Sequence, residues 1–297
     1  MSAPPTIIAG PQPTSRLDRG RFAGSAMIVG TSASIQIAAA LAHDLFGTLG
    51  PTGTSALRFL LGASILLAAV RPRLRGRDGQ TWRAIVRYGV SLAALNLTFF
   101  EAIERIPMGI AVTLAFLAPL TMAVMGSRRR RDLGFAVLAG VGVVLLGGVS
   151  PPGSTLGMVF ALASGAAWAS VAYAGRTVGS RTSRLDGLAL ALPIAAVVTL
   201  PFGIARFGAI DAHDLGLGLV IAVGGLILPF ALELEGLRRL EPRLVAVIYS
   251  LDPAIAAVVG FLALGQTLTG VQALGMAAVV LASLGAIWSS GRRRMAR

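Results

Sequence analysis

Ionisable side chains inside long apolar stretches are the residues of this sequence that could do chemistry. Asp252 lies about nine residues, or roughly 13 Å along a helix, into the apolar stretch 244–264. A charged group at the centre of a bilayer costs at least about 2.5–3.5 kcal/mol, so such a group indicates function by default. Asp252 is therefore predicted to exchange protons at membrane depth. The alternative is structural, because Asp252 could instead cap a helix that Pro253 interrupts.

Two glutamates lie near the end of the preceding apolar stretch, 214–235. Glu233 and Glu235 are about 200° apart around a helix, so they cannot face one cavity together. Glu235 can reach Arg239, one turn further on, at the membrane surface. Glu233 is therefore the glutamate predicted to assist Asp252 in proton coupling.

Arg58 and Glu101 occupy similar depths in two different apolar stretches, 53–70 and 84–103. This similarity predicts an ion pair near the outer membrane surface. The pair could act as an outer gate that opens when substrate or a proton competes for the carboxylate. It could equally serve only to neutralise two charges that are costly in lipid.

Four uncharged polar or aromatic residues are candidates for binding a substrate. Gln36 and Asn96 carry amides well inside their stretches, where they suit hydrogen bonding to a zwitterion or to another helix. Trp168 and Tyr249 could line a substrate passage, although aromatic rings in a helix bundle also serve packing.

Ten apolar stretches must position these residues. Each can cross about 30 Å of hydrocarbon as a helix rising about 1.5 Å per residue. The stretches are 24–43, 53–70, 84–103, 107–126, 132–149, 155–175, 187–205, 214–235, 244–264 and 268–288. The predicted fold class is thus an all-α integral membrane protein with ten transmembrane helices.

Arginine is concentrated in alternate gaps between these stretches. Of the 26 basic residues, all of them arginine, only Arg105 and Arg206 fall in outer segments, and Arg58 lies inside a span. This positive-inside bias places both termini in the cytoplasm and the chain in the cell's inner membrane. The net charge of +13 is expected to face the anionic membrane lipids. Nucleic acid is not an expected partner, because no basic face carries interleaved aromatic residues.

Missing residue types exclude several kinds of chemistry. The absence of cysteine excludes disulfides, iron–sulfur clusters and thiol nucleophiles. The absence of lysine removes the phosphate-binding residue of a Walker loop and any Schiff base. His43 and His213 both fall in predicted outer loops and cannot form a three-ligand zinc site without carboxylates. No catalytic residues, metal or cofactor are therefore expected.

The chain divides into two halves that match weakly at a fixed offset. Placing Pro119 on Pro253, a shift of 134 residues, also brings Glu101 onto Glu235. Each half holds an odd number of spans, so the halves would insert in opposite orientations, as inverted repeats. The predicted division is a disordered cytoplasmic tail at 1–22, five-helix repeats at 23–150 and 151–290, and a basic cytoplasmic tail at 291–297.

Several short motifs resemble the threonine/homoserine exporter branch of the drug/metabolite transporter superfamily, which has two five-helix EamA repeats. The motifs are Ala33-Ser34-Ile35-Gln36, Ala56-Leu57-Arg58, Gly89-Val90-Ser91-Leu92 with Asn96, Pro107-Met108-Gly109-Ile110-Ala111-Val112, Ser127-Arg128-Arg129 and Ala167-Trp168-Ala169. The resemblance covers about 24–288. It implies a central cavity surrounded by the first four helices of each half. The fifth and tenth helices would be peripheral, where they could form a homodimer contact.

The chain departs from this branch at two of three acidic positions. The resemblance implies acids where this sequence has Ala115, Asp252 and Gln266, so only Asp252 keeps one. The acid at 252 preserves a proton site, whereas the other two changes leave the substrate open.

We expect a proton-coupled exporter of small amino acids or related metabolites that works by alternating access. The alternatives are export of amphiphilic drugs or cationic metabolites, and metabolite uptake. An intramembrane enzyme would need clustered acids with a metal, or a nucleophile with its base, and the sequence shows no such set. A membrane scaffold or sensor would need a soluble domain, for which the sequence offers no segment.

Overall fold

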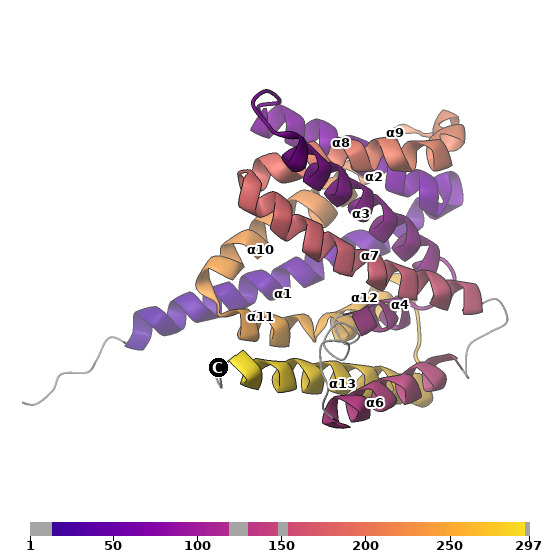
Figure 1. Ribbon diagram of the computed structural model, residues 1–297. Coiled ribbons are helices and arrows are strands. Elements are labelled where there is room, and N and C mark those ends of the chain that lie inside the picture. Colours follow the sequence, from indigo (N-terminus) through magenta and orange to yellow (C-terminus); the bar gives the residue numbers. More distant parts are fainter. Residues whose placement is uncertain (1–13, 119–129, 148–153, 295–297) are drawn as a thin grey trace, which may run out of the picture.

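The computed structural model describes residues 14–118, 130–147 and 154–294, and all regular secondary structure within these ranges is helical. Figure 1 shows long helices that cross one another at several angles. The first half of the chain contributes α1 (Thr14–Asp44), α2 (Phe46–Val70), α3 (Gly79–Ile103), α4 (Met108–Ala115) and α6 (Arg130–Gly147).

The second half contributes more, shorter elements, because two of its predicted spans are broken. They are α7 (Ser154–Arg181), α8 (Arg184–Gly203), the 3₁₀ helix η1 (Ile204–Ala209), α9 (Ala212–Ala222), the π-helical turn η2 (Val223–Ile227), α10 (Leu228–Arg239), α11 (Pro242–Tyr249), α12 (Asp252–Leu264) and α13 (Gly270–Arg294). The predicted span 214–235 changes to a π-helical turn at η2. The predicted span 244–264 is interrupted at residues 250–251, just before Pro253.

Side chains just outside the helices explain where several of them begin. Asp78 accepts a 3.0 Å hydrogen bond from the backbone N–H of Thr81 at the start of α3. Asp211 does the same for Asp214 at the start of α9, at 2.7 Å. Such caps satisfy backbone donors that the first helical turn leaves free. At the end of α12, Gly265 adopts a left-handed conformation with φ of 62°, which terminates that helix.

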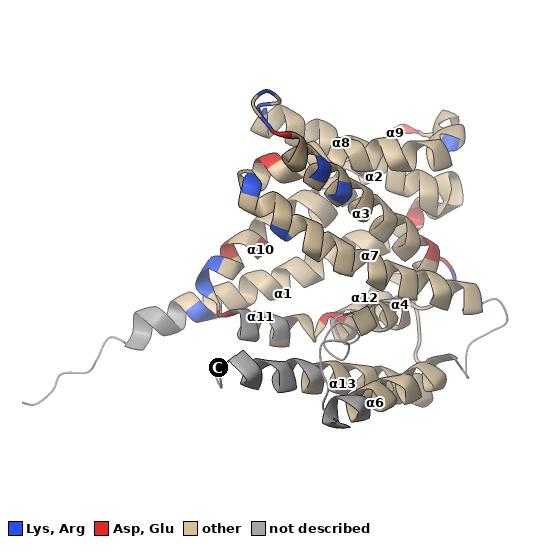
Figure 2. Ribbon diagram, viewed as in Figure 1, with Lys and Arg blue, Asp and Glu red and all other residues tan. Residues whose placement is uncertain are grey.

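Among the described residues, six segments are long and apolar enough to cross a membrane: Gly20–Asp44, Phe46–Val70, Ser154–Arg181, Leu185–Ala209, Ala212–Arg239 and Val247–Leu264. Shorter apolar segments occur in α6 (Gly134–Leu146) and α13 (Gly270–Gly285). Charged residues gather mainly towards the ends of the helices (Figure 2). An all-helical membrane fold is therefore confirmed. The count of ten spans stays a prediction, since part of the predicted span 107–126 lies outside the described residues.

Helices extend into both predicted tails, and the division of the chain into tails and repeats stays a prediction. Helix α1 already begins at Thr14, so residues 14–22 are helical rather than disordered. Helix α13 extends to Arg294 and includes most of the predicted basic tail 291–297. Pro119 and Ser127-Arg128-Arg129 lie outside the described residues.

The most extensive packing joins the two halves of the chain, in the five pairs that follow and also between α3 and α8. Helix α3 packs on α7, α2 on α8, α1 on α10, α4 on α12, and α6 on α13. Glycines allow several of these close approaches. A Cβ atom on Gly89 would lie 2.6 Å from the carbonyl oxygen of Ala191, and one on Gly142 would lie 2.7 Å from that of Gly275. Close backbone contact at small residues is the usual basis of helix association in lipid.

The largest apolar cluster occupies one end of the bundle. It joins the end of α1, the start of α2, the end of α3 and the start of α4, and includes Phe46, Leu49, Phe100, Ile103 and Met108. These helix ends are the ones that the arginine pattern predicts to face outward. Along α1 and α3, the polar residues of the candidate site lie on the predicted cytoplasmic side of this cluster.

Candidate functional site

A pair of acidic side chains forms the centre of the candidate site. Asp252, the first residue of α12, and Glu233, in α10, lie close enough to interact electrostatically. Asp252 is buried, with only 8% of its surface exposed, and Glu233 is half-buried. The hydroxyl of Tyr249, at the end of α11, donates a 2.8 Å hydrogen bond to Oε1 of Glu233. Three residues singled out in the sequence are thus brought together.

The break between α11 and α12 places Asp252 in this pair. Residues 250–251 form a turn, and α12 restarts with Asp252 followed by Pro253, whose fixed φ suits the first turn of a helix. Oδ1 of Asp252 is buried without a hydrogen-bond partner. Since a capping carboxylate would accept bonds from the helix backbone, this orphaned oxygen argues against the purely structural interpretation of Asp252.

Two further residues extend the acid pair, and sequence reasoning missed both. Ser32 of α1 is a polar neighbour of Asp252. The phenol of Tyr88, on α3, interacts electrostatically with Glu233. We call Ser32, Tyr88, Glu233, Tyr249 and Asp252 the acid cluster. A signal for Ser32 existed in its spacing of four residues from Gln36, which places both side chains on one face of α1.

Both amide side chains predicted to bind substrate are buried, and the oxygen of each lacks a hydrogen-bond partner. Gln36 is 4% exposed and Asn96 is 8% exposed. Oε1 of Gln36 and Oδ1 of Asn96 make no hydrogen bond with the protein. Buried amides are normally satisfied, so two orphaned oxygens on α1 and α3 are suited to a polar ligand. Trp168 is half-buried, and its ring packs 5.9 Å from that of Phe116.

The predicted ion pair between Arg58 and Glu101 does not form. Arg58 is 5% exposed, and its Nη2 donates to the carbonyl oxygen of Gly225 in the π-helical turn. Its guanidinium also lies 5.6 Å from the ring centroid of Phe100, while its Nε has no partner. Glu101 pairs instead with Arg105, one turn further along α3.

The physical reason lies in the backbone of η2. A π-helical turn changes the hydrogen-bond pattern of the helix and can expose a carbonyl to a side chain. Gly225 has no Cβ atom, so the Arg58 guanidinium can approach this carbonyl closely. Arg58 is therefore drawn towards the second half of the chain, away from the end of α3. By contrast, the predicted contact between Glu235 and Arg239 is confirmed, at 2.7 Å.

The two positions at which the sequence departs from the exporter branch that it resembles have structural explanations. Oε1 of Gln266 accepts a 2.9 Å hydrogen bond from the backbone N–H of Met108 at the start of α4. An amide oxygen serves this purpose as well as a carboxylate. Ala115 is buried against α7, where Gly165 directly faces its backbone, so an acidic side chain would find little room.

Another group of ionisable side chains lies outside the acid cluster. Ligand atoms of Asp211, His213 and Asp214 lie within 4.8 Å of one another at the start of α9. Asp211 is already engaged as the cap of this helix, and both Asp211 and His213 are exposed. Helix capping is a sufficient explanation for this group.

Comparisons with known proteins identify relatives of the whole chain. Residues 22–149 and 155–288 each match the model of the EamA-like transporter family. The threonine/homoserine exporter RhtA of Salmonella typhimurium strain LT2 is 39% identical over 261 residues, which cover 85% of this chain and 87% of that protein. RhtA of Escherichia coli strain K12 is 38% identical over 259 residues, with the same coverage. Protein PecM of Dickeya dadantii is 26% identical over 67% of this chain and 71% of its own.

A solved crystal structure has the same fold. It is 21% identical in sequence, aligns with a TM-score of 0.60, and covers 88% of this chain and 96% of its own.

Proposed function

The chain belongs to the EamA-like transporter family, and we propose that it exports small amino acids of the threonine and homoserine type in exchange for protons. It is a multi-pass inner-membrane protein, and its relatives at 38–39% identity are exporters rather than enzymes. Substrate class, coupling ion and mechanism are the parts that we propose.

Proton coupling is supported by the acid cluster. Carboxyl groups at membrane depth are costly, and chains of such groups serve as proton relays in pumps and transporters. Here Asp252 and Glu233 are close enough to interact electrostatically, and neither pairs with a basic side chain within the described residues. A buried acid pair without a counter-ion can take up a proton from one side of the membrane and release it to the other. This pair is the single observation on which proton coupling depends.

Amino-acid recognition is supported by buried polar groups on α1 and α3, the helices that also carry Ser32 and Tyr88. Gln36 lies one turn from Ser32 on α1, and its unpartnered oxygen can accept a hydrogen bond from an ammonium or hydroxyl group. Asn96 offers a second orphaned oxygen from α3. Tyr249 donates a hydrogen bond to Glu233, so it can couple substrate binding to proton binding. Trp168 stays a prediction, because its contact with Phe116 serves packing equally well.

Alternating access is supported by the pattern of helix pairs. If the two halves are inverted repeats, exchanging them turns the α3–α7 contact into the contact between α10 and α1. The same exchange leaves the pairs α2–α8, α4–α12 and α6–α13 unchanged. All five pairs occur in the structure, as a two-fold relation between the halves requires. The breaks at η2 and at residues 250–251 supply places where spans in the second half can bend.

Transport by purified protein in liposomes tests this function. Vesicles loaded with labelled threonine, homoserine or a hydrophobic cation would be compared with and without an imposed pH gradient. Gradient-driven movement of threonine or homoserine, competed by the other, is the expected result. Movement of the hydrophobic cation alone would instead support a drug exporter. Movement of amino acids only in the same direction as protons would support uptake.

A further inference from the structure

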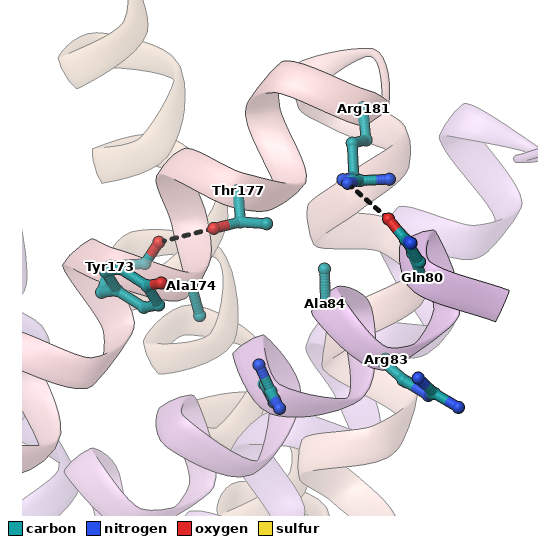
Figure 3. A pocket seen from close by; sticks show the side chains of 8 residues that line it. Gln80, Arg83, Ala84, Tyr173, Ala174, Thr177 and Arg181 are labelled. Atoms are coloured by element: carbon teal, nitrogen blue, oxygen red, sulfur yellow. Dashed lines mark hydrogen bonds between the residues drawn. The ribbon is translucent and has the colours of Figure 1, made fainter. Parts of the chain in front are cut away.

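The ends of α3 and α7 that are predicted to face the cytoplasm enclose a basic hollow (Figure 3). We call it the α3–α7 hollow; its volume is about 270 Å³. It is lined by Gln80, Arg83, Ala84 and Arg87 from α3, and by Tyr173, Ala174, Thr177 and Arg181 from α7. A second hollow lies beside it and shares Arg181.

The two hollows differ in how their charges are balanced. In the second hollow, Arg77 pairs with Asp186 at 2.8 Å, and Asp78 faces Arg181 at 3.6 Å. The α3–α7 hollow has no acidic lining residue. Within the described part of the chain, neither Arg83 nor Arg87 lies at ion-pair distance from a carboxylate. The α3–α7 hollow is therefore the one with uncompensated positive charge.

The position of these two arginines is unfavourable without an anion. Arg83 and Arg87 are four residues apart on α3, where like charges face each other and destabilise a helix. Both arginines are exposed and also belong to the positive-inside pattern. That pattern explains their charge and their side of the membrane, but not the hollow that they line together with α7.

Apolar side chains continue the same face of α3 towards the membrane interior. Val86 and Val90 fall within about 100° of Arg83 and Arg87 around the helix. They are 45% and 43% exposed, and Tyr173 beside the hollow is 71% exposed. This face of α3 thus combines the positive charges of Arg83 and Arg87 with the exposed apolar side chains of Val86 and Val90. The exposed ring of Tyr173 lies beside it.

We propose that the α3–α7 hollow binds the phosphate of an anionic glycerophospholipid. Arg83 and Arg87 contact the phosphate, Tyr173 lies at the level of the glycerol, and an acyl chain covers Val86 and Val90. Arg181 borders the site but is already engaged by Gln80 and Asp78. A basic pocket between helices on the cytoplasmic side is a known kind of head-group site. The uncovered valines favour a lipid over a soluble phosphate compound, because a soluble anion would leave them exposed.

Lipid retention by the full-length protein tests this site. The purified protein would be equilibrated in detergent with phosphatidylglycerol or phosphatidylcholine, and bound lipid counted by native mass spectrometry. Arg83→Gln with Arg87→Gln should weaken phosphatidylglycerol binding by about 30-fold, the loss expected for two arginine contacts to an anionic lipid. Arg83→Lys with Arg87→Lys should retain much of it. Phosphatidylcholine binding should change little in any variant.

Arg176→Gln is the matched control, because Arg176 is exposed on α7 and lines neither hollow. It should bind phosphatidylglycerol like the wild type. Equal retention by the Arg83→Gln/Arg87→Gln variant and the wild type would overturn the lipid site. Displacement of the lipid by millimolar glycerol phosphate would also overturn it, in favour of a soluble anion. Lipid counting does not depend on transport, so these outcomes are separate from those for the exporter function.

Discussion

The hydroxyl of Tyr249 donates a 2.8 Å hydrogen bond to the carboxylate of Glu233, and so joins the end of α11 to α10. Tyr249 lies three residues before Asp252 and interacts electrostatically with it as well. A single phenol therefore hydrogen-bonds to one member of the acid pair and interacts electrostatically with the other. Any change in the charge of Glu233 or Asp252 will therefore change the electrostatic interactions of Tyr249, which lies next to the break between α11 and α12.

Replacing Asp252 by Asn should abolish efflux driven by a pH gradient, because the amide cannot carry a proton. Exchange of labelled for unlabelled amino acid without a gradient should persist, since the shape of the side chain is kept. Liposome flux under both conditions measures the two effects. Glu235→Gln is the control and should behave like the wild type, because Glu235 pairs with Arg239 outside the acid cluster. Normal gradient-driven efflux by Asp252→Asn would refute the role of Asp252.

Tyr249→Phe should destabilise the protein by about 0.6–1.7 kcal/mol, the range for a hydrogen bond between membrane helices. The ring is kept, so the effect isolates the hydroxyl. Unfolding in detergent, followed by circular dichroism, measures the change. Combining Tyr249→Phe with Glu233→Gln should cost less than the sum of the two, because they share one contact. Tyr173→Phe, on an exposed tyrosine, should have no effect.

Arg58→Ala and Glu101→Ala should have additive effects on stability, within about 0.3–0.5 kcal/mol. Arg58→Ala should cost about 1–3 kcal/mol, because it leaves the Gly225 carbonyl without its side-chain donor. Glu101→Ala removes a contact with Arg105 on the same helix, typically worth about 0.3–0.5 kcal/mol. Unfolding free energies of the single and double variants check this. A strongly non-additive result would mean that the two side chains do interact.

Gln266→Leu should destabilise the contact between α12 and α4 by about 1 kcal/mol, because the Met108 N–H loses its acceptor. Gln266→Glu keeps an acceptor oxygen at the same place and should be close to the wild type in stability. Thermal unfolding midpoints of the two variants, measured side by side, distinguish the lost hydrogen bond from a general effect of substitution. Equal midpoints for Leu and Glu would show that the hydrogen bond contributes nothing.

Acidification should weaken the start of α3 through Asp78. The hydrogen bond from Thr81 lowers the pKa of Asp78 below its usual value of 3.8. A lowered folded-state pKa means that the charged cap stabilises the protein at and above pH 3.8, and that this contribution is lost as the pH falls through the folded-state pKa. Asp78→Asn keeps a capping oxygen but cannot titrate. The stability difference between wild type and Asp78→Asn should therefore shrink below pH 3.8, as thermal unfolding across pH will show.

The sequence was most informative where polarity and depth coincide. Asp252, Glu233 and Tyr249 could be identified because each is a polar group in an otherwise apolar stretch, and they do lie together. Tyr88 could not, because single tyrosines are common in membrane helices and carry no charge to mark them. Ser32 was marked only by its spacing of four residues from Gln36.

The partner of Arg58 could not be predicted for a different reason. It depends on a backbone carbonyl that belongs to a π-helical turn, and backbone acceptors leave no side-chain pattern. The adjacent Gly224 and Gly225 were the available signal, since paired glycines inside a span permit both an irregular backbone and a close side-chain approach. Likewise, the prolines in residues 1–13 suggested a disordered tail, but α1 begins directly after them.

The amide of Gln266 has one more consequence for how the protein responds to its surroundings. Because an amide keeps the same charge from acid to alkali, the hydrogen bond from Met108 to Gln266 does not depend on the pH at the membrane surface. If Asp252 and Glu233 carry protons as proposed, acid and base can act on them without weakening the contact between α12 and α4.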